Sequence, residues 1–355
     1  MFKFSYAAFC VGFASLGLGA LASAGEPAAR PTYASTHTIT VGAPERWDYL
    51  ALDSDTHRLY LAHGDRVEVL DGGTGALIGR VSGIPGGTHG IGIVGALGKG
   101  YTDDGEAGEV VVFDVHTFKV LRRIKGQPDA DGIVVDPKTQ HVFIVNGDSG
   151  NLTVVDPQAD KVIATVKVGG GLEFAVADGR GKLYVNGEEK RELVRIDTPT
   201  SAVDARWPIP DCESAHGLAM DTVTRRLFVS CANRILNVVD ADSGAVVAKL
   251  PIGRGTDAAA FDPKRKLIFS SNGADGTISV IREDSPQSFT PLEDIPTAIT
   301  GRTMSIDPAT GRLYVAAAAI DPKASVAPRP DGRPGRPTPL PNSLKVLFLD
   351  PKDAR

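Results

Sequence analysis

Residues 305–315 read Ser-Ile-Asp-Pro-Ala-Thr-Gly-Arg-Leu-Tyr-Val: a short apolar stretch ending in Asp, a turn, and a second apolar stretch that follows Arg. Close variants occur earlier in the chain, at residues 134–146, 219–229 and 260–269. Asp is favoured at the first position of a tight turn, and Leu-Tyr-Val is typical of a strand. Each copy therefore predicts two short strands joined by a turn.

The same unit returns every 41 to 45 residues, and each copy continues with a strand ending in Val-Val-Asp or similar and a last strand ending in Gly. The residues that end the first strand, here called the anchors, are Asp53, Val94, Asp136, Asp178, Asp221, Asp262 and Asp307. Seven units of four short strands at this period predict an all-β fold, a seven-bladed β-propeller of four-stranded blades. The alternative, a two-sheet sandwich, would not need a fixed period.

Residues 38–42, Thr-Ile-Thr-Val-Gly, match the fourth strand of other units, such as residues 164–169. We therefore expect this N-terminal strand to close the last blade, which removes the exposed edges of the ring. The predicted organisation is a linker over residues 25–36 and one propeller domain over residues 37–355. Seven prolines between residues 321 and 342 predict an extended loop within the last blade, serving as a lid, a partner-docking arm or a disordered segment.

The start of the chain has the pattern of a secretory signal peptide over residues 1–24. Lys3 precedes an apolar run over residues 7–21, and Ala22-Ser23-Ala24 forms a small-residue cleavage site. The alternative, a membrane anchor, would need about 20 apolar residues. We expect a periplasmic or secreted protein that has no membrane span after cleavage and is a monomer.

Charge and composition exclude several classes of protein. The formal net charge of −5 becomes −6 when Lys3 is removed, so there is no basic field to attract nucleic acid. Hydrophobic residues make up 42% of the chain, which is enough for a full core and too much for a disordered protein. Three Cys are too few for a disulfide-stapled miniprotein.

The Arg-Leu-Tyr-Val and Val-Val-Asp patterns resemble the YVTN-repeat propellers, specifically the exported YncE-like branch, over nearly the whole mature chain. Longer stretches also look like that branch: Arg-Trp-Asp-Tyr at residues 46–49, Glu-Phe-Ala-Val-Ala-Asp at 173–178, Ser-Ser-Asn-Gly at 270–273 and Glu-Asp-Ser-Pro at 283–286. The resemblance implies a propeller fold and export, in a family that is mostly without an assigned reaction. The Gly-His…Trp-Asp signature of WD40 blades is absent.

The residue five before each anchor opens the innermost strand of its blade, at the rim of the central channel. These residues, here called the inner ring, are Asp48, His89, Asp131, Glu173, His216, Asp257 and Arg302. All seven are ionisable, and with neutral His they carry a local charge of −3. Two interpretations stand: a hydrated polar funnel in which Arg302 and water bridge the acids, or a site for a cation or other ligand.

If the funnel binds a metal, the candidate ligands are Asp131, Glu173 and Asp257, and the ion is Ca²⁺, Zn²⁺ or Mn²⁺. The residue ten after each anchor was expected beside the ring. This second set is His63, Asp104, Asn146, Cys231, Asn272 and Ala317, with Asn186 close by in the fourth unit. Trp47 and Phe174 flank the ring, where they form an apolar wall for a ligand or pack between blades.

Cys212 lies four residues before His216, and Cys231 ends the neighbouring second strand on the same face. The pair also looks like the corresponding pair of the YncE-like branch, and an oxidising compartment favours a disulfide between them. The alternative is a Cys-Cys-His metal centre, which needs reduced thiols.

The sequence contains no compact catalytic motif, so we expect a binding protein that presents the funnel to a small ligand, a metal ion or a protein partner. The alternative is a divalent-metal-dependent lactonase, hydrolase or lyase acting at the same funnel, with His216 or His89 as the base. Fold analogy alone supports that alternative.

Overall fold

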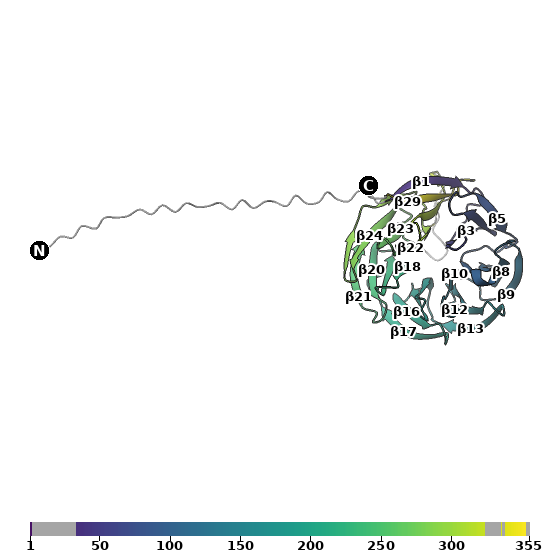
Figure 1. Ribbon diagram of the computed structural model, residues 1–355, viewed down its shortest axis with the longest axis horizontal. Coiled ribbons are helices and arrows are strands. Elements are labelled where there is room, and N and C mark those ends of the chain that lie inside the picture. The colour runs from purple at the N-terminus through teal and green to yellow at the C-terminus, as the bar shows by residue number, and fades with distance from the viewer. Residues whose placement is uncertain (2–32, 324–334, 336–337, 353–355) are drawn as a thin grey trace.

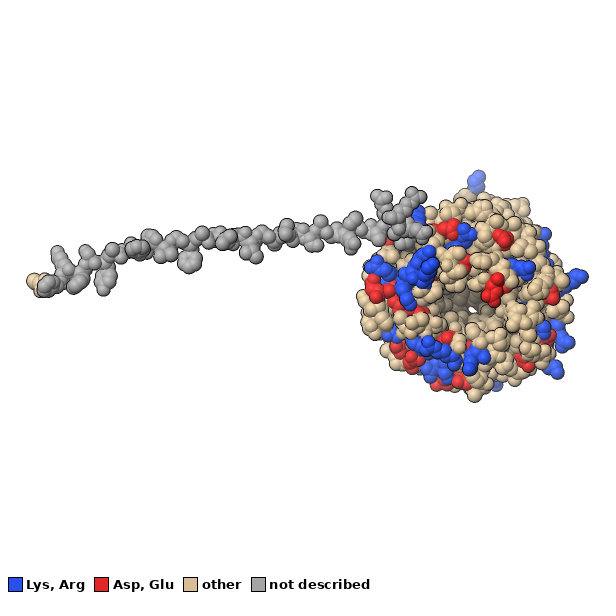
Figure 2. Space-filling view, viewed as in Figure 1, with Lys and Arg blue, Asp and Glu red and all other residues tan. Residues whose placement is uncertain are grey.

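The computed structural model describes residues 33–323 and 338–352, together with Met1 and Gly335. These residues form a disc of seven antiparallel sheets around a central axis (Figure 1), which confirms the predicted seven-bladed β-propeller. The disc is hollowed at its centre, and charges of both signs are interspersed over the face in view (Figure 2). Within the described part of the chain, no helix is long and apolar enough to cross a membrane. The predicted signal peptide and most of the loop over residues 321–342 lie outside the described residues.

Blades 1 to 6 each use consecutive strands, beginning with the one nearest the axis. Blade 1 contains β2 (Leu50–Asp53), β3 (Arg58–His63), β4 (Arg66–Asp71) and β5 (Leu77–Val81); blade 2 contains β6 (Ile91–Val94), β7 (Lys99–Asp104), β8 (Glu109–Asp114) and β9 (Val120–Lys125); blade 3 contains β10 (Ala130–Val135), β11 (Val142–Asn146), β12 (Asn151–Asp156) and β13 (Lys161–Lys167). The single 3-10 turn of the described residues, η1 (Gly95–Leu97), joins β6 to β7.

Blade 4 contains β14 (Leu172–Ala177), β15 (Lys182–Gly187), β16 (Glu192–Asp197) and β17 (Ala202–Pro208); blade 5 contains β18 (Ala215–Asp221), β19 (Arg226–Cys231), β20 (Ile235–Asp240) and β21 (Val246–Pro251). Blade 6 contains β22 (Ala259–Asp262), β23 (Leu267–Asn272), β24 (Thr277–Ser285) and β25 (Ser288–Pro291), and a short fifth strand, β26 (Ile295–Pro296), also pairs with β24.

Blade 7 combines the two ends of the described chain, as expected. Its strand order is β1 (Tyr33–Thr40), β29 (Lys345–Pro351), β28 (Leu313–Ala317) and β27 (Thr303–Ile306), and the register pairs Tyr33 with Pro351 and Thr40 with Lys345. The predicted linker over residues 25–36 was too long, because the strand already begins at Tyr33. The Tyr33 side chain is 2% exposed and packs in the core of blades 6 and 7. This packing holds the start of β1 against the ring.

One aromatic side chain from the second strand of every blade is fully buried. The seven are Tyr60, Tyr101, Phe143, Tyr184, Phe228, Phe269 and Tyr314. Each is the central residue of a Leu-Tyr-Val unit or its variant, and each stabilises the fold by about 1.5–3 kcal/mol. Three also join neighbouring blades, because Tyr101 Oη donates a hydrogen bond to Asp160 Oδ1 (3.1 Å), Tyr184 Oη donates one to Ala241 O (3.1 Å) and Tyr314 Oη donates one to Gly72 O (2.8 Å). The repeat motif therefore fills the core and connects adjacent blades.

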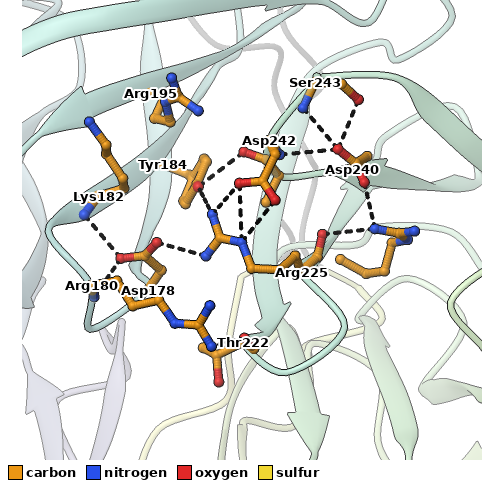
Figure 3. A network of polar contacts seen from close by, with 12 residues as sticks. Asp178, Arg180, Lys182, Tyr184, Arg195, Thr222, Arg225, Asp240, Asp242 and Ser243 are labelled. Carbon is orange, nitrogen blue, oxygen red and sulfur yellow. Dashed lines mark hydrogen bonds and ion pairs between the residues drawn. The ribbon is translucent and has the colours of Figure 1, made fainter.

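The anchor Asp residues hold a turn and contact the next blade as well. Asp178 Oδ1 accepts hydrogen bonds from the backbone N–H groups of Arg180 (2.8 Å) and Lys182 (3.0 Å). Its Oδ2 accepts a hydrogen bond from Arg225 Nη1 of blade 5 at 2.8 Å, and Arg225 Nη2 donates one to Tyr184 Oη at 2.9 Å (Figure 3). A residue type favoured by a local turn thus also links blade 4 to blade 5.

Two acidic side chains meet at the corresponding junction between blades 5 and 6. Glu283 is 5% exposed, and its Oε1 accepts a hydrogen bond from Thr224 Oγ1 at 2.7 Å. The anchor Asp221 accepts a hydrogen bond from Lys266 Nζ at 2.6 Å. Burial, followed by the neighbouring Asp221 carboxylate, raises the pKa of Glu283 to about 7. Glu283 therefore binds a proton more tightly in the folded protein than in the unfolded chain.

The substitution Glu283→Gln should remove a pH-dependent loss of stability. Because the pKa of Glu283 is raised on folding, its contribution is fully present below the unfolded pKa of about 4.5 and is lost as the pH rises toward about 7. The difference in free energy of unfolding, variant minus wild type, should therefore be about 1–2 kcal/mol more positive at about pH 8 than at about pH 5. Urea unfolding at both pH values measures this, and an unchanged difference between the two proteins would contradict it.

Candidate functional site

The residues of the inner ring lie at the start of the seven inner strands. In three blades the strand pairing shifts at this point, between Ala130 and Ile133, between Leu172 and Ala175, and between Ala215 and Leu218. An irregularity of this kind re-aims a side chain, and the three residues concerned are Asp131, Glu173 and His216. The other four, Asp48, His89, Asp257 and Arg302, lie one or two residues before their inner strands.

Four of the ring residues line one cavity of about 720 Å³, namely Asp48, His89, Asp131 and Glu173. The cavity is more acidic than the ring itself, because loops between strands add further carboxylates. Its acidic lining residues are Asp48, Asp129, Asp131, Asp148, Glu173, Glu188, Glu189 and Glu213, and Arg191 also lines it. This cavity with its lining is called the acidic funnel below.

Carboxylates at the bottom of the acidic funnel hold their protons more tightly than usual. Burial, followed by the charges of Asp48 and Glu173, raises the pKa of Asp131 well above its ordinary value. Burial also raises the pKa of Glu173, with Asp257 and Glu188 adding to the effect and His216 opposing it. The arrangement therefore concentrates negative charge that a cation would stabilise.

His216, Asp257 and Arg302 continue the ring beside the acidic funnel. His216 Nδ1 lies 3.6 Å from Glu173 Oε1 and 3.9 Å from Asp257 Oδ1. Arg302 Nη1 donates a hydrogen bond to Asp257 Oδ2 at 2.6 Å, and its Nη2 donates one to Trp47 O at 3.1 Å. Burial disfavours charge on His216, but the attraction of Glu173, Asp257 and Glu188 outweighs it and raises the pKa to about 9.

His89, the other candidate base, is engaged through both ring nitrogens. Its Nδ1 lies 2.7 Å from Asp103 Oδ2, and its Nε2 lies 3.3 Å from Arg46 Nη2. Asp103 Oδ1 also accepts hydrogen bonds from the backbone N–H groups of His89 (2.8 Å) and Gly90 (3.1 Å). Burial disfavours charge on His89, whereas Asp103 favours it, and the net effect raises the pKa of His89. These contacts fix the imidazole between a carboxylate and a guanidinium.

Two aromatic residues from opposite sides of the ring meet in the channel. Tyr49 of blade 1 stacks on Phe174 of blade 4, with ring centroids 4.5 Å apart and an angle of 30° between the planes. Burial, followed by the charge of Asp131, raises the pKa of Tyr49 well above its ordinary value. Trp47 instead is 7% exposed and packs in the core with blade 7. Phe174 is thus paired with Tyr49 and not with Trp47 as expected, and the two stacked rings are here called the aromatic pair.

A signal for Tyr49 was present in the repeat. The residue four before each anchor is small or short in five blades, and aromatic in the other two; the set is Tyr49, Gly90, Gly132, Phe174, Gly217, Ala258 and Thr303. Five short side chains leave space in the channel, and two aromatic rings fill it. Comparing this position across the repeats would have found the aromatic pair.

Most of the second set turns away from the ring, contrary to expectation. Asn146 Nδ2 donates a hydrogen bond to Thr153 Oγ1 (3.0 Å) and Asn272 Nδ2 donates one to Ser279 Oγ (2.9 Å), both on the third strand of their blades. Successive side chains of a strand point to opposite faces, so the residue one position earlier faces the inner strand instead. In blade 2, for example, Asp103 is the residue before Asp104, and its carboxylate contacts His89 of the inner ring. The other members of the second set, His63, Asp104, Cys231 and Ala317, are buried.

Asn186 behaves differently because blade 4 is one residue shorter. Its Nδ2 donates a hydrogen bond to the backbone oxygen of His216 at 2.7 Å, which ties the inner strand of blade 5 to blade 4. Counted with this deletion, Asn186 corresponds to Asp103 rather than to Asn146. The expected contact with the ring was therefore correct for Asn186, although it was grouped with the wrong residues.

The predicted disulfide between Cys212 and Cys231 is confirmed, with an Sγ–Sγ distance of 1.99 Å and both residues fully buried. The alternative Cys-Cys-His metal centre is wrong, because both sulfurs are bonded to each other. The bridge fixes the loop that carries Ser214 and leads into β18. Ser214 Oγ in turn donates a hydrogen bond to Glu188 Oε1 at 2.7 Å.

One group of potential metal ligands occurs among the described residues. It consists of Glu173, Glu188 and His216, whose ligand atoms all lie within 4.8 Å of one another. Of the predicted metal set, Asp131 and Asp257 are not members. Glu188 was missed although it is the residue ten after the anchor Asp178, because Asn186 was chosen in its place to allow for the shorter blade 4.

Known proteins resemble this chain in fold only. No known family model matches the chain, and no curated protein matches it. Three solved structures share its architecture. A chain of Kuenenia stuttgartiensis hydrazine synthase is 15% identical with a TM-score of 0.66, covering 75% of this chain and 91% of that chain. U3-55K is 10% identical with a TM-score of 0.71, covering 87% and 98%.

The WD40 repeats of RRP9 are 11% identical with a TM-score of 0.73, covering 90% of this chain and 99% of that chain. This chain therefore adopts the same arrangement of blades without the Trp-Asp signature. Propellers present loops and a channel mouth on a rigid ring, so the fold supports a binding or scaffolding role.

Proposed function

We propose that this protein is an exported binding protein whose acidic funnel takes a positively charged ligand. The observation that carries the proposal is the lining of one cavity of about 720 Å³ by eight carboxylate residues. Export is supported by the signal pattern over residues 1–24 and by the resemblance to the YncE-like branch. The Cys212–Cys231 disulfide fits an oxidising compartment.

A bound cation relieves the electrostatic repulsion between the carboxylates of the acidic funnel. Asp131 lies in the field of Asp48, Glu173 and Asp257, and burial removes the water that would screen these charges. A bound cation restores favourable electrostatics, and the acidic mouth steers it inward. The volume of the cavity is in the range that suits a small molecule.

A polyamine is the probe that suits this cavity. It carries several ammonium groups, which can pair with several of the eight carboxylates that line the acidic funnel.

The substitution Asp131→Asn should weaken spermidine binding about tenfold, because the amide keeps the shape of the side chain but cannot ionise when a cation binds. Isothermal titration calorimetry at low ionic strength measures the affinity, and added salt should weaken it further. The matched control is Glu293→Gln, which removes an exposed carboxylate beside β26 and should bind as wild type does. Equal affinity in all three proteins, or no spermidine binding by wild type, would contradict the proposed function.

A further inference from the structure

We infer that Glu173, Glu188 and His216 form a binding site for one divalent transition-metal ion of the zinc class. The inference rests on the proposed function, since it names a specific cation for one side of the acidic funnel. Three elements bring the ligands together: β14 carries Glu173, the β15–β16 hairpin carries Glu188, and β18 carries His216. Their ligand atoms lie within 4.8 Å of one another.

The separation of the imidazole and the first carboxylate fits a shared ion better than a hydrogen bond. His216 Nδ1 lies 3.6 Å from Glu173 Oε1, whereas a charge-assisted N–H···O bond brings these atoms to about 2.7–2.9 Å. Two ligands that each lie about 2.1 Å from one tetrahedral ion are about 3.4 Å apart. A small closing movement would therefore bring both atoms into coordination.

The imidazole nitrogen that faces the carboxylates has no hydrogen-bond partner within the described part of the chain, although it is buried. A buried polar atom without a partner is unfavourable unless it has another role. Coordination to a metal ion would satisfy Nδ1 of His216.

Neighbouring residues orient two of the ligands through hydrogen bonds, as the groups around metal ligands commonly do. Ser214 Oγ donates a hydrogen bond to Glu188 Oε1 at 2.7 Å, and Asn186 Nδ2 donates one to the backbone oxygen of His216 at 2.7 Å. The Cys212–Cys231 disulfide fixes the loop that carries Ser214. Such contacts orient ligands and raise metal affinity.

The donor set selects the ion. Imidazole nitrogen and carboxylate oxygen both bind zinc, three protein ligands leave a fourth position open for water, and Mn²⁺ accepts the same donor atoms. Ca²⁺ prefers six to eight oxygen ligands, which this group does not offer. Asp257 Oδ1, 3.9 Å from His216 Nδ1, adds negative charge, while its other oxygen accepts a hydrogen bond from Arg302.

The test is zinc binding by the purified, tag-free protein after chelator treatment, followed by calorimetry with Zn²⁺, Mn²⁺ and Ca²⁺. We expect one zinc ion per chain, weaker binding of Mn²⁺, and no binding of Ca²⁺ at this group. Glu188→Gln should weaken zinc binding by at least about tenfold. The control is Glu293→Gln, which removes an exposed carboxylate outside the acidic funnel and should leave zinc affinity unchanged.

Circular dichroism and a thermal melt establish that both variants are folded, and His216→Asn provides a second ligand variant with the same expected loss. Absence of zinc binding by wild type, or equal affinity in Glu188→Gln and Glu293→Gln, would overturn the site. Spermidine titration of the same samples separates the two proposals. Spermidine binding without zinc binding would remove the metal site and leave the proposed function, whereas loss of both would remove both.

Discussion

Replacing Tyr33 with alanine should lower the free energy of unfolding by about 3–5 kcal/mol. The side chain is 2% exposed, and its ring meets Phe269 of blade 6 edge-on at a centroid distance of 5.2 Å. Its Oη donates a hydrogen bond to Gly311 O at 2.9 Å. Truncation therefore leaves a cavity between blades 6 and 7 and a buried carbonyl without its partner.

Urea unfolding followed by tryptophan fluorescence measures this loss, and two companion variants locate its cause. Tyr33→Phe keeps the packing and should lose about 1 kcal/mol, the net contribution of one hydrogen bond. Thr38→Ala changes an exposed residue of the same strand and should stay within about 0.5 kcal/mol of wild type. A Tyr33→Ala protein as stable as Thr38→Ala would show that the side chain does not hold β1 in place.

The double substitution Cys212→Ala with Cys231→Ala should lower the free energy of unfolding by about 3 kcal/mol. The bridge closes a loop between residues 19 positions apart, and a loop of this length restricts the unfolded chain by about that amount. Both residues are fully buried in the core of blade 5, so alanine leaves a small cavity in addition.

Reduction supplies the independent measurement. Wild type unfolded in the presence of a thiol reductant should lose most of this stability but stay above the double variant, which also carries the cavity, whereas the variant should be insensitive to the reductant. If reduction left the urea midpoint of wild type unchanged, the bridge would contribute nothing to stability. Zinc and spermidine titrations of the double variant would also show how far the loop carrying Ser214 depends on the bridge.

The fold could be predicted because single positions of the repeat each meet a local and a long-range requirement. Asp178 suits a tight turn and also accepts Arg225 of the next blade, so its spacing follows the spacing of the blades. The aromatic residue of each Leu-Tyr-Val unit has a strand propensity and also fills the core. Closure by the N-terminal strand followed from the same pattern, although the strand began at Tyr33 rather than at residue 37.

The site was only partly predictable, because its details depend on side-chain direction and on loops. The repeat located the inner ring at the start of the inner strands, yet counting ten residues from an anchor selected side chains on the wrong face of the second strand. In blade 4 that count leads to Glu188, which was passed over in favour of Asn186. Tyr49 was detectable, but only by asking which channel positions carry a large side chain.

The pairing of β1 with β29 has a consequence for the order in which this protein can be assembled. The register joins residue 33 to residue 351, so the first strand to be synthesised waits for the last. Until residues 345–351 emerge, blade 7 lacks a strand and the partly built ring exposes unpaired edges on both sides. Contacts this distant in sequence form slowly. A nascent chain therefore passes through an open, edge-exposed intermediate, and protection from aggregation matters most before β29 is complete.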